Sequence, residues 1–194
     1  MKKAAIWAGL ALLILVPLAI AAASPLQASR NAPYIIASLA GVAALGVLTL
    51  QPLLARAHLP DVTPPRQRKW HRMLGATLLL LVALHIGGLY ITSPPDALDA
   101  LLLASPTPFS IYGVTAMWAI VITALLAATW RRLHLRPRTW RAIHALLAVV
   151  IVSSTIIHAV QIEGTMGWWS KLALCISGAI SLASVLWVRY VRGR

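Results

Sequence analysis

Apolar residues occupy six long runs along the chain, and short segments rich in proline, glycine and arginine separate these runs. Each run has the length of an α-helix that spans the hydrocarbon core of a bilayer, which is about 20 residues. Lipid offers no hydrogen-bond partner to an exposed backbone, so runs of this length are expected to be helical. The sequence therefore predicts six membrane-spanning helices, at about residues 4–22, 34–56, 70–92, 109–130, 140–162 and 168–189.

The composition places the whole chain in a membrane. Of its 194 residues, 60% are hydrophobic and 11% are charged, whereas a soluble domain carries roughly 25% charged residues. We therefore expect an all-α membrane protein in which residues 1–194 form a single six-helix bundle. The excess of 17 basic over 4 acidic residues does not indicate nucleic-acid binding, because the basic residues lie in short segments where they anchor helix ends.

Basic residues also predict how the helices are oriented. All lysines and arginines except Arg30 and Lys171 fall at the two ends of the chain or in the second and fourth connections. Short cytoplasmic segments carry the excess of basic residues in membrane proteins. We therefore expect both termini and these two connections to face the cytoplasm, with the bacterial inner (plasma) membrane as the location. The third and fifth helices then both run outwards and are parallel.

The first apolar run has a second interpretation. Lys2 and Lys3, the run itself and the alanines at 21–23 also resemble a signal peptide with its cleavage site. The run is long for a signal peptide, so we expect it to be retained. Cleavage would leave the orientation of the later helices unchanged.

Two matched pairs of histidines occur in the third and fifth helices. His71 and His85 lie 14 residues apart, and so do His144 and His158. At 100° per residue this spacing falls only about 40° short of four turns, so both histidines of a helix face the same way, roughly 21 Å apart. Because the helices are parallel, depth predicts that His71 pairs with His144 near the cytoplasm, and His85 with His158 in the outer half.

Each pair of imidazoles suits the iron of a haem. Haem iron takes two axial ligands besides the four porphyrin nitrogens, whereas zinc requires four ligands around one point. The single cysteine, Cys175, excludes the Cys-x-x-Cys-His motif of covalent attachment. We therefore predict two non-covalent b-type haems with the four histidines as axial ligands. In an alternative interpretation the histidines relay protons in a transporter or proton pathway.

Arginines near the inner histidine pair are candidate partners of the haem propionates. Arg72 follows His71, and Arg138 and Arg141 precede His144 within two turns. A guanidinium binds a carboxylate strongly, but these arginines are equally well explained as anchors at the cytoplasmic surface.

Other residues carry weaker signals. His58 and His134 fall in the basic connections and are not expected to bind metal. Trp70 and Trp140 are interpreted as residues of the membrane interface first and of haem packing second. Several glycines are explained either by close helix packing or by space for a porphyrin edge; these are Gly75, Gly87, Gly88 and Gly113.

The residues around the histidines resemble one known family. The resemblance is carried by Lys69-Trp-His-Arg-Met-Leu-Gly through Leu84-His85, and by Arg138-Thr-Trp-Arg-Ala-Ile-His144 through Ile157-His158. They are similar to the ferric reductase-like transmembrane domain, the membrane core of ferric reductases, NADPH oxidases and the haem subunit of the methionine-sulfoxide reductase system. The resemblance covers the second to sixth helices. It implies six helices, cytoplasmic termini, two b-type haems and transmembrane electron transfer.

One part of the family pattern is missing. Ferric reductases and NADPH oxidases continue into a flavin and nicotinamide domain, but this chain ends at Arg194 and has no Gly-rich dinucleotide fingerprint. We therefore expect an electron-transfer subunit of an oxidoreductase, reduced by a cytoplasmic flavin reductase or a membrane quinol. The expected acceptor lies at the outer face and is ferric iron, oxygen or a periplasmic redox protein.

The sequence leaves three further alternatives open. The chain could be the haem membrane subunit of a periplasmic methionine-sulfoxide reductase-type system. It could be an assembly subunit without electron throughput. It could also be a quinol- or ascorbate-linked di-haem cytochrome b of another fold, in which histidines pair across a different set of helices.

Overall fold

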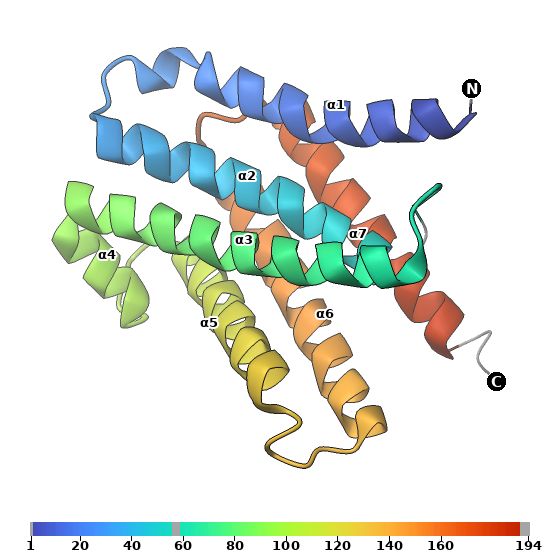
Figure 1. The fold of residues 1–194 in the computed structure, drawn as a ribbon. Coiled ribbons are helices and arrows are strands. Elements are labelled where there is room, and N and C mark those ends of the chain that lie inside the picture. The colour runs from blue at the N-terminus through green and yellow to red at the C-terminus, as the bar shows by residue number, and fades with distance from the viewer. Residues whose placement is uncertain (1, 56–58, 191–194) are drawn as a thin grey trace.

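The computed structural model describes residues 2–55 and 59–190, and every element in these two segments is a helix. Six helices are long and apolar enough to cross a membrane, as the hydrophobic pattern predicts. They are α1 (Lys2–Ala22), α2 (Ala32–Ala55), α3 (Pro64–Thr92), α5 (Pro108–Thr129), α6 (Pro137–Gln161) and α7 (Trp168–Tyr190). A 3₁₀ turn, η1 (Pro25–Gln27), joins α1 to α2, and a short helix, α4 (Pro94–Leu101), joins α3 to α5 (Figure 1).

Proline lies in the first turn of η1, α3, α4, α5 and α6. Its fixed φ and missing N–H suit a helix start, where that N–H would have no partner within the helix. The helix α3 begins at Pro64 rather than at about 70, because residues 66–69 are too polar to count as part of a spanning run. The eight residues of α4 were not predicted either, since they are too short for such a run.

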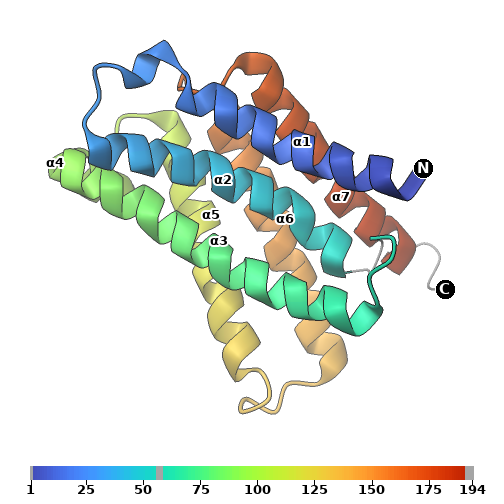
Figure 2. The ribbon, with the colours of Figure 1, turned by 45° about the horizontal axis from the view of Figure 1, so that its top comes forward.

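Two antiparallel helix pairs form the centre of the bundle. The helix α2 lies along α3, and α5 lies along α6 (Figures 1 and 2). The helix α7 packs on α2 and α6, and α1 packs on α2 and α7. We call the end formed by Lys3, Arg66, Arg131 and Arg138 the basic end, and the opposite end the far end. The helices α1, α3 and α6 all begin at the basic end (Figure 1).

The first helix is held to the rest of the bundle at several levels. At the basic end, Lys3 Nζ lies 2.6 Å from Asp61 Oδ1, and the rings of Trp7 and Trp70 meet edge to face with centroids 6.2 Å apart. Further along, the side chain of Ile14 fills the space beside Gly46, where a Cβ would lie 2.9 Å from it. The first apolar run therefore packs as a helix of the bundle.

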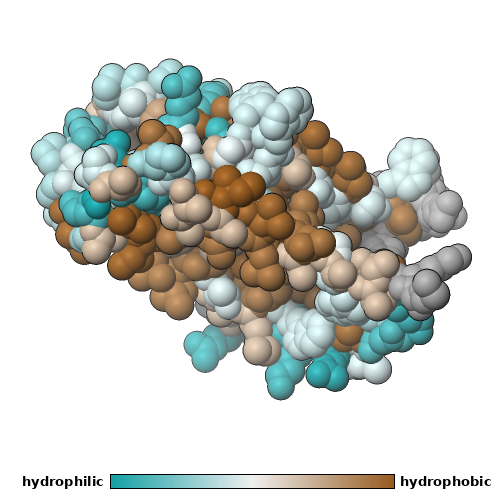
Figure 3. Space-filling model, turned by 90° about the horizontal axis from the view of Figure 1, so that it is seen from above, coloured by the Kyte–Doolittle hydropathy of each residue, from teal (hydrophilic) through white to brown (hydrophobic). Residues whose placement is uncertain are grey.

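Small and branched apolar side chains fill the space between the two helix pairs. Large apolar side chains also remain exposed on the outside, such as Leu80 and Ile91, which are 60% and 69% exposed. On the face seen in Figure 3, apolar residues cover the middle of the molecule, and hydrophilic residues gather toward its ends. This distribution is the one expected of a bundle surrounded by lipid. The buried core consists of Ala44, Leu48, Leu78, Ala119, Ile120, Ile151 and Val152.

Gln67 ties the start of α3 to the connection that precedes it. Its side chain is fully buried. Its Nε2 donates hydrogen bonds to the carbonyl oxygens of Leu59 and Val62, both at 2.8 Å, and its Oε1 accepts one from the Leu59 N–H at 3.2 Å. One side chain thus satisfies three backbone groups of the connection between α2 and α3.

Replacing Gln67 by leucine is expected to destabilise the protein. Each buried backbone group that loses its partner costs about 1–3 kcal/mol, so Gln67→Leu should lower the midpoint of thermal unfolding in detergent. Gln161→Leu makes the same chemical change at an exposed position at the end of α6 and is the control. Equal unfolding midpoints for the two variants would contradict the structural role of Gln67.

Candidate metal centres

The four histidines of α3 and α6 lie at two levels of the bundle, with two histidines at each level. At the basic end, the imidazole centroids of His71 and His144 are 6.0 Å apart, and the planes of the rings are inclined by 74°. Toward the far end, His158 lies close enough to His85 for a charge on one ring to act on the other. The structure thus brings together the same partners that depth along the two helices predicts.

The backbone of α2 holds both histidines of α3. The Nδ1–H of His71 donates a hydrogen bond to the carbonyl oxygen of Gln51 at 3.1 Å. About four helical turns further along α3, the Nδ1–H of His85 donates to the carbonyl oxygen of Ala37 at 2.8 Å. Both acceptors lie inside the helix and already serve the backbone ladder, so the imidazoles use the second lone pair of each oxygen. The antiparallel contact between α2 and α3 therefore fixes both rings.

The helix α5 holds the second histidine of α6 in the same way. The Nδ1–H of His158 donates to the carbonyl oxygen of Phe109 at 2.8 Å, and the Phe109 ring packs against the imidazole with centroids 5.9 Å apart. A carbonyl oxygen can only accept a hydrogen bond. Nδ1 is therefore the protonated nitrogen in all three carbonyl-bonded rings, and Nε2 keeps the lone pair with which an imidazole binds a metal.

Aromatic side chains surround the pair at the basic end. The ring of Trp140 lies 5.1 Å from the ring of His144, and Trp130 stacks on Trp140 at 6.0 Å with an interplanar angle of 12°. The guanidinium of Arg131 lies over Trp130. Trp140 therefore contacts one of the paired histidines, whereas Trp70 packs on α1. Trp130, which was not predicted to have a role, extends a series of ring contacts from His144 toward the connection between α5 and α6.

An apolar layer separates the two histidine pairs. Leu78 lies seven residues from each histidine of α3, and Ile151 lies seven residues from each histidine of α6. Seven residues are close to two helical turns, so each side chain lies on the face that carries the histidines. Both are 6% exposed and belong to the same buried core. The two pairs are thus distinct sites with hydrocarbon between them.

The arginines considered as propionate partners lie near the first pair. Arg72, Arg138 and Arg141 are all exposed at the basic end, and Arg72 lies close enough to His71 for its charge to act on the imidazole. Their exposure agrees with an anchoring role and leaves their side chains able to reach toward the histidines.

The remaining histidines lie away from the pairs. His134 is exposed in the connection between α5 and α6, and His58 lies outside the described residues. Within residues 2–55 and 59–190, no group of three or more His, Cys, Asp or Glu side chains could hold a metal ion. Each pair offers two protein ligands, which is the number that a haem takes.

At the far end a basic side chain is buried near the end of α6. Lys171, in the first turn of α7, is 6% exposed, and its Nζ donates a hydrogen bond to the carbonyl oxygen of Ile162. The same ammonium lies 5.8 Å from the centre of the Trp168 ring. Lys171 thus closes the end of α6 four residues beyond His158.

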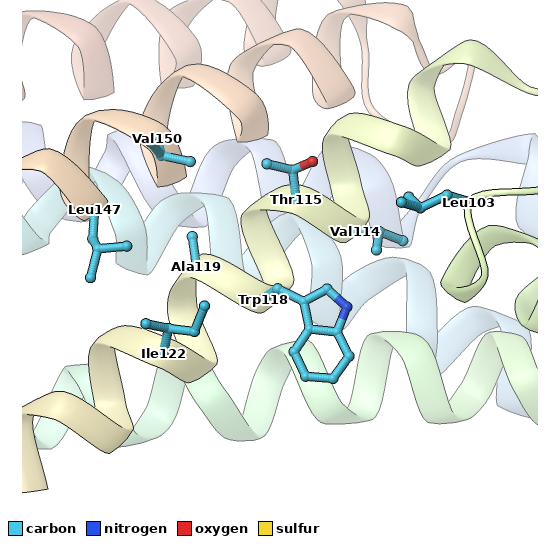
Figure 4. Close-up of a pocket in the computed structure, with 8 residues that line it drawn as sticks. All are labelled: Leu103, Val114, Thr115, Trp118, Ala119, Ile122, Leu147 and Val150. Atoms are coloured by element: carbon cyan, nitrogen blue, oxygen red, sulfur yellow. The ribbon is translucent and has the colours of Figure 1, made fainter. Parts of the chain in front are cut away.

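An apolar groove of about 350 Å³ runs along α5 and α6, and α6 is one of the two helices that carry the histidines. Figure 4 shows its lining, with the indole of Trp118 projecting from α5. Its polar groups are the Trp118 N–H and the Thr115 hydroxyl, and the hydroxyl already donates to the Ile111 carbonyl. The groove can accept a flat or flexible apolar group, but it adds no ligand to the histidine pairs. It is lined by Leu103, Val114, Thr115, Trp118, Ala119, Ile122, Leu147 and Val150.

Sequence analysis missed the groups that orient the histidines. The acceptors belong to the backbone of Ala37, Gln51 and Phe109, and a backbone carbonyl leaves no signature in the identity of its residue. The one available signal is positional, since Ala37 precedes His85 by 48 residues and Phe109 precedes His158 by 49. The two separations are nearly equal, but this is noticed only when α2 and α3 are compared with α5 and α6.

Comparison with known proteins now adds to this geometry. A family model described as the ferric reductase like transmembrane component matches residues 40–155. The match covers more than half of the chain and includes His71, His85 and His144, and it ends just before His158. No curated protein matches the chain. By this match, the chain belongs to the ferric reductase-like transmembrane family.

Proposed function

We propose that this protein carries electrons across the membrane, with one b-type haem bound by His71 and His144 and another by His85 and His158. Membership of the ferric reductase-like family supports transmembrane electron transfer. The observation that carries the proposal to these residues is the contact of His71 with His144 and the proximity of His85 to His158. In addition, Nδ1 of three of the four rings is bonded to a backbone carbonyl. When bound, the two haems supply one-electron carriers at two depths.

The residues present fit such a group. Imidazole nitrogens bind first-row metals at about 2.0–2.1 Å, so two imidazoles on opposite sides of one metal have centroids roughly 6 Å apart. The centroids of His71 and His144 are 6.0 Å apart. The carbonyl-bonded Nδ1–H of the other rings also matches the arrangement of metal-binding histidines, in which the second nitrogen donates to a carbonyl or carboxylate.

The hydrogen bonds from Nδ1–H to the backbone carbonyls set the properties of the imidazoles as metal ligands. A carbonyl that accepts from Nδ1–H fixes the tautomer and the direction of Nε2, and it makes the imidazole a stronger donor to a metal. The low dielectric of the bundle and the surrounding lipid strengthens these hydrogen bonds. These residues therefore hold the imidazoles ready before a metal arrives.

Leu78 and Ile151 argue against a proton pathway. From residue 73 to residue 84 of α3, and from residue 145 to residue 157 of α6, the sequence contains no titratable side chain. A histidine relay would need a continuous series of water or polar groups over the roughly 21 Å between the two levels. Hydroxyl groups occur there at Thr77 and at residues 153–155, but the buried core around Leu78 and Ile151 is hydrocarbon. Electrons can cross such a layer by tunnelling, whereas protons cannot.

The basic end is the side at which we propose that electrons enter. The positive-inside rule places it in the cytoplasm, and its exposed arginines form a surface that would attract an acidic flavoprotein. A membrane quinol is the other candidate donor. Electrons would leave at the far end to ferric iron, to oxygen or to a periplasmic redox protein, and a methionine-sulfoxide reductase is one protein of that last class.

Asparagine variants separate metal binding from structure. The Asn amide can keep the hydrogen bond that Nδ1–H makes but has no equivalent of Nε2. The purified wild-type protein is expected to show b-type absorption bands with dithionite and two haems per chain. His85→Asn and His158→Asn should each lose the far-end haem and keep the other, as measured by pyridine haemochrome content and redox titration.

His134→Asn is the control for these variants. His134 is exposed and has a φ of 51°, a conformation that asparagine tolerates. The His134→Asn variant should retain two haems. A full haem content in both His85→Asn and His158→Asn would refute the ligand assignment. A colourless wild-type protein would favour a transporter.

Neutralising arginines of the connection between α5 and α6 should weaken reduction by an acidic flavoprotein. Arg131→Gln combined with Arg132→Gln is expected to slow that reduction severalfold at low salt and less at high salt, because screening already weakens the attraction. Reduction by dithionite should not change. Arg30→Gln at the far end is the control.

Electron throughput is measured in vesicles that hold an oxidant on one side and receive the reduced flavoprotein on the other. If the combined Arg131→Gln and Arg132→Gln variant matches the wild-type rate at low salt, this surface is not the docking site. If haem is reduced but the oxidant is not, the protein is an assembly subunit rather than a conductor.

A further inference from the structure

Two glycines on different helices lie directly against the histidines of the far-end pair. A Cβ at Gly41 of α2 would lie 2.9 Å from Nδ1 of His85. A Cβ at Gly113 of α5 would lie 2.7 Å from both Nδ1 and Cε1 of His158. Contacts this short do not occur with real Cβ atoms, so any other residue would push the ring away.

Each of these glycines lies one helical turn beyond the carbonyl that the ring uses. His85 donates to Ala37, four residues before Gly41, and His158 donates to Phe109, four residues before Gly113. Residues four apart on an α-helix lie on one face, so a ring that reaches the first must lie over the second. The absence of a side chain at the second position lets the ring lie against the helix, so that Nδ1 approaches the carbonyl closely.

A comparison within the chain supports this explanation. His71 donates to Gln51, and the residue one turn beyond that carbonyl is Ala55 instead of glycine. The hydrogen bond is 3.1 Å there, against 2.8 Å at both glycine positions.

Other glycines of the bundle have a different role. A Cβ at Gly88 would meet the Pro33 carbonyl oxygen at 2.6 Å and Ala37 Cβ at 2.8 Å, and one at Gly46 would meet Ile14. Those two glycines permit close packing of helices. At Gly41 and Gly113, by contrast, the nearest atoms all belong to a histidine ring.

We propose that Gly41 and Gly113 are positioning residues for the far-end metal centre, and that they set the direction and donor strength of its two imidazoles. This inference rests on the proposed function, since it concerns two residues that lie against the proposed haem ligands His85 and His158. By permitting the Nδ1–H to carbonyl bond, each glycine keeps Nε2 aimed away from its helix and makes the imidazole a stronger donor. Axial donor strength is one of the quantities that tune haem potential.

The test uses Gly41→Ala and Gly113→Ala in the full chain, purified with its haem. Each is expected to shift the midpoint potential of the far-end haem upwards, because a weaker donor stabilises the oxidised iron less. The low-spin electron paramagnetic resonance signal of that haem should change as its imidazoles rotate. The haem of His71 and His144 should be unaffected. Two substitutions on separate helices are thus expected to alter the far-end haem and to leave the other haem unchanged.

Gly9→Ala on α1 and Gly178→Ala on α7 are the matched controls. A Cβ at Gly9 would meet nothing within 4 Å, and one at Gly178 would make an ordinary contact of 3.5 Å with Thr49. All four substitutions gain the same helix propensity, so an effect shared with the controls would be structural. If Gly41→Ala and Gly113→Ala leave the far-end potential and signal as the controls do, the inference is wrong.

If the Gly41→Ala protein does not accumulate, the double variant Gly41→Ala with His85→Asn tests the inference instead. In His85→Asn the ring is gone, so Gly41→Ala should add no further loss of yield to that background, as in a double-mutant cycle. Equal additional loss in both backgrounds would overturn the inference. Failure of the proposed function is distinguishable, because wild-type protein would then lack haem altogether.

Discussion

The hydrogen bond from an imidazole Nδ1–H to a carbonyl of the neighbouring helix is the interaction on which the candidate site depends. In a membrane no water competes for that carbonyl, and a ring without a partner would be costly. His71, His85 and His158 all make this bond. It decides the tautomer, the ring orientation and which nitrogen remains available, so the chemistry of the pairs follows from how the helices pack.

The bond also links the site to the arrangement of the bundle. The acceptors on α2, Ala37 and Gln51, are separated by the same number of residues as the histidines on α3. In an antiparallel pair this equality lets both rings bond at once in a single register. The pair α5 and α6 repeats the arrangement with Phe109 and His158. Two similar helix hairpins thus face each other, and each contributes one imidazole to each level.

The sequence was sufficient for the parts of the structure that depend on hydrophobicity and spacing. Six apolar runs of the right length predict six helices, and the depth of each histidine along parallel helices predicts its partner. Hydrophobicity could not predict the polar first turns of α3 or the short helix α4, because neither is apolar enough to span lipid. The carbonyl acceptors were also beyond reach, since they are set by the register between helices. Gly113 was noted only as space, and Gly41 was not noted at all.

The hydrocarbon layer formed by Leu78 and Ile151 has a consequence for the energetics of the cell. If electrons cross it while protons are held back, each turnover moves net charge over part of the bilayer. Such a current is electrogenic, and moving one charge across the full membrane is worth about 2.3 kcal/mol per 100 mV. With the basic end inside, outward electron flow runs with the field of a negative-inside membrane and dissipates it. The voltage across the bilayer would then act as a second driving force beside the difference in redox potential.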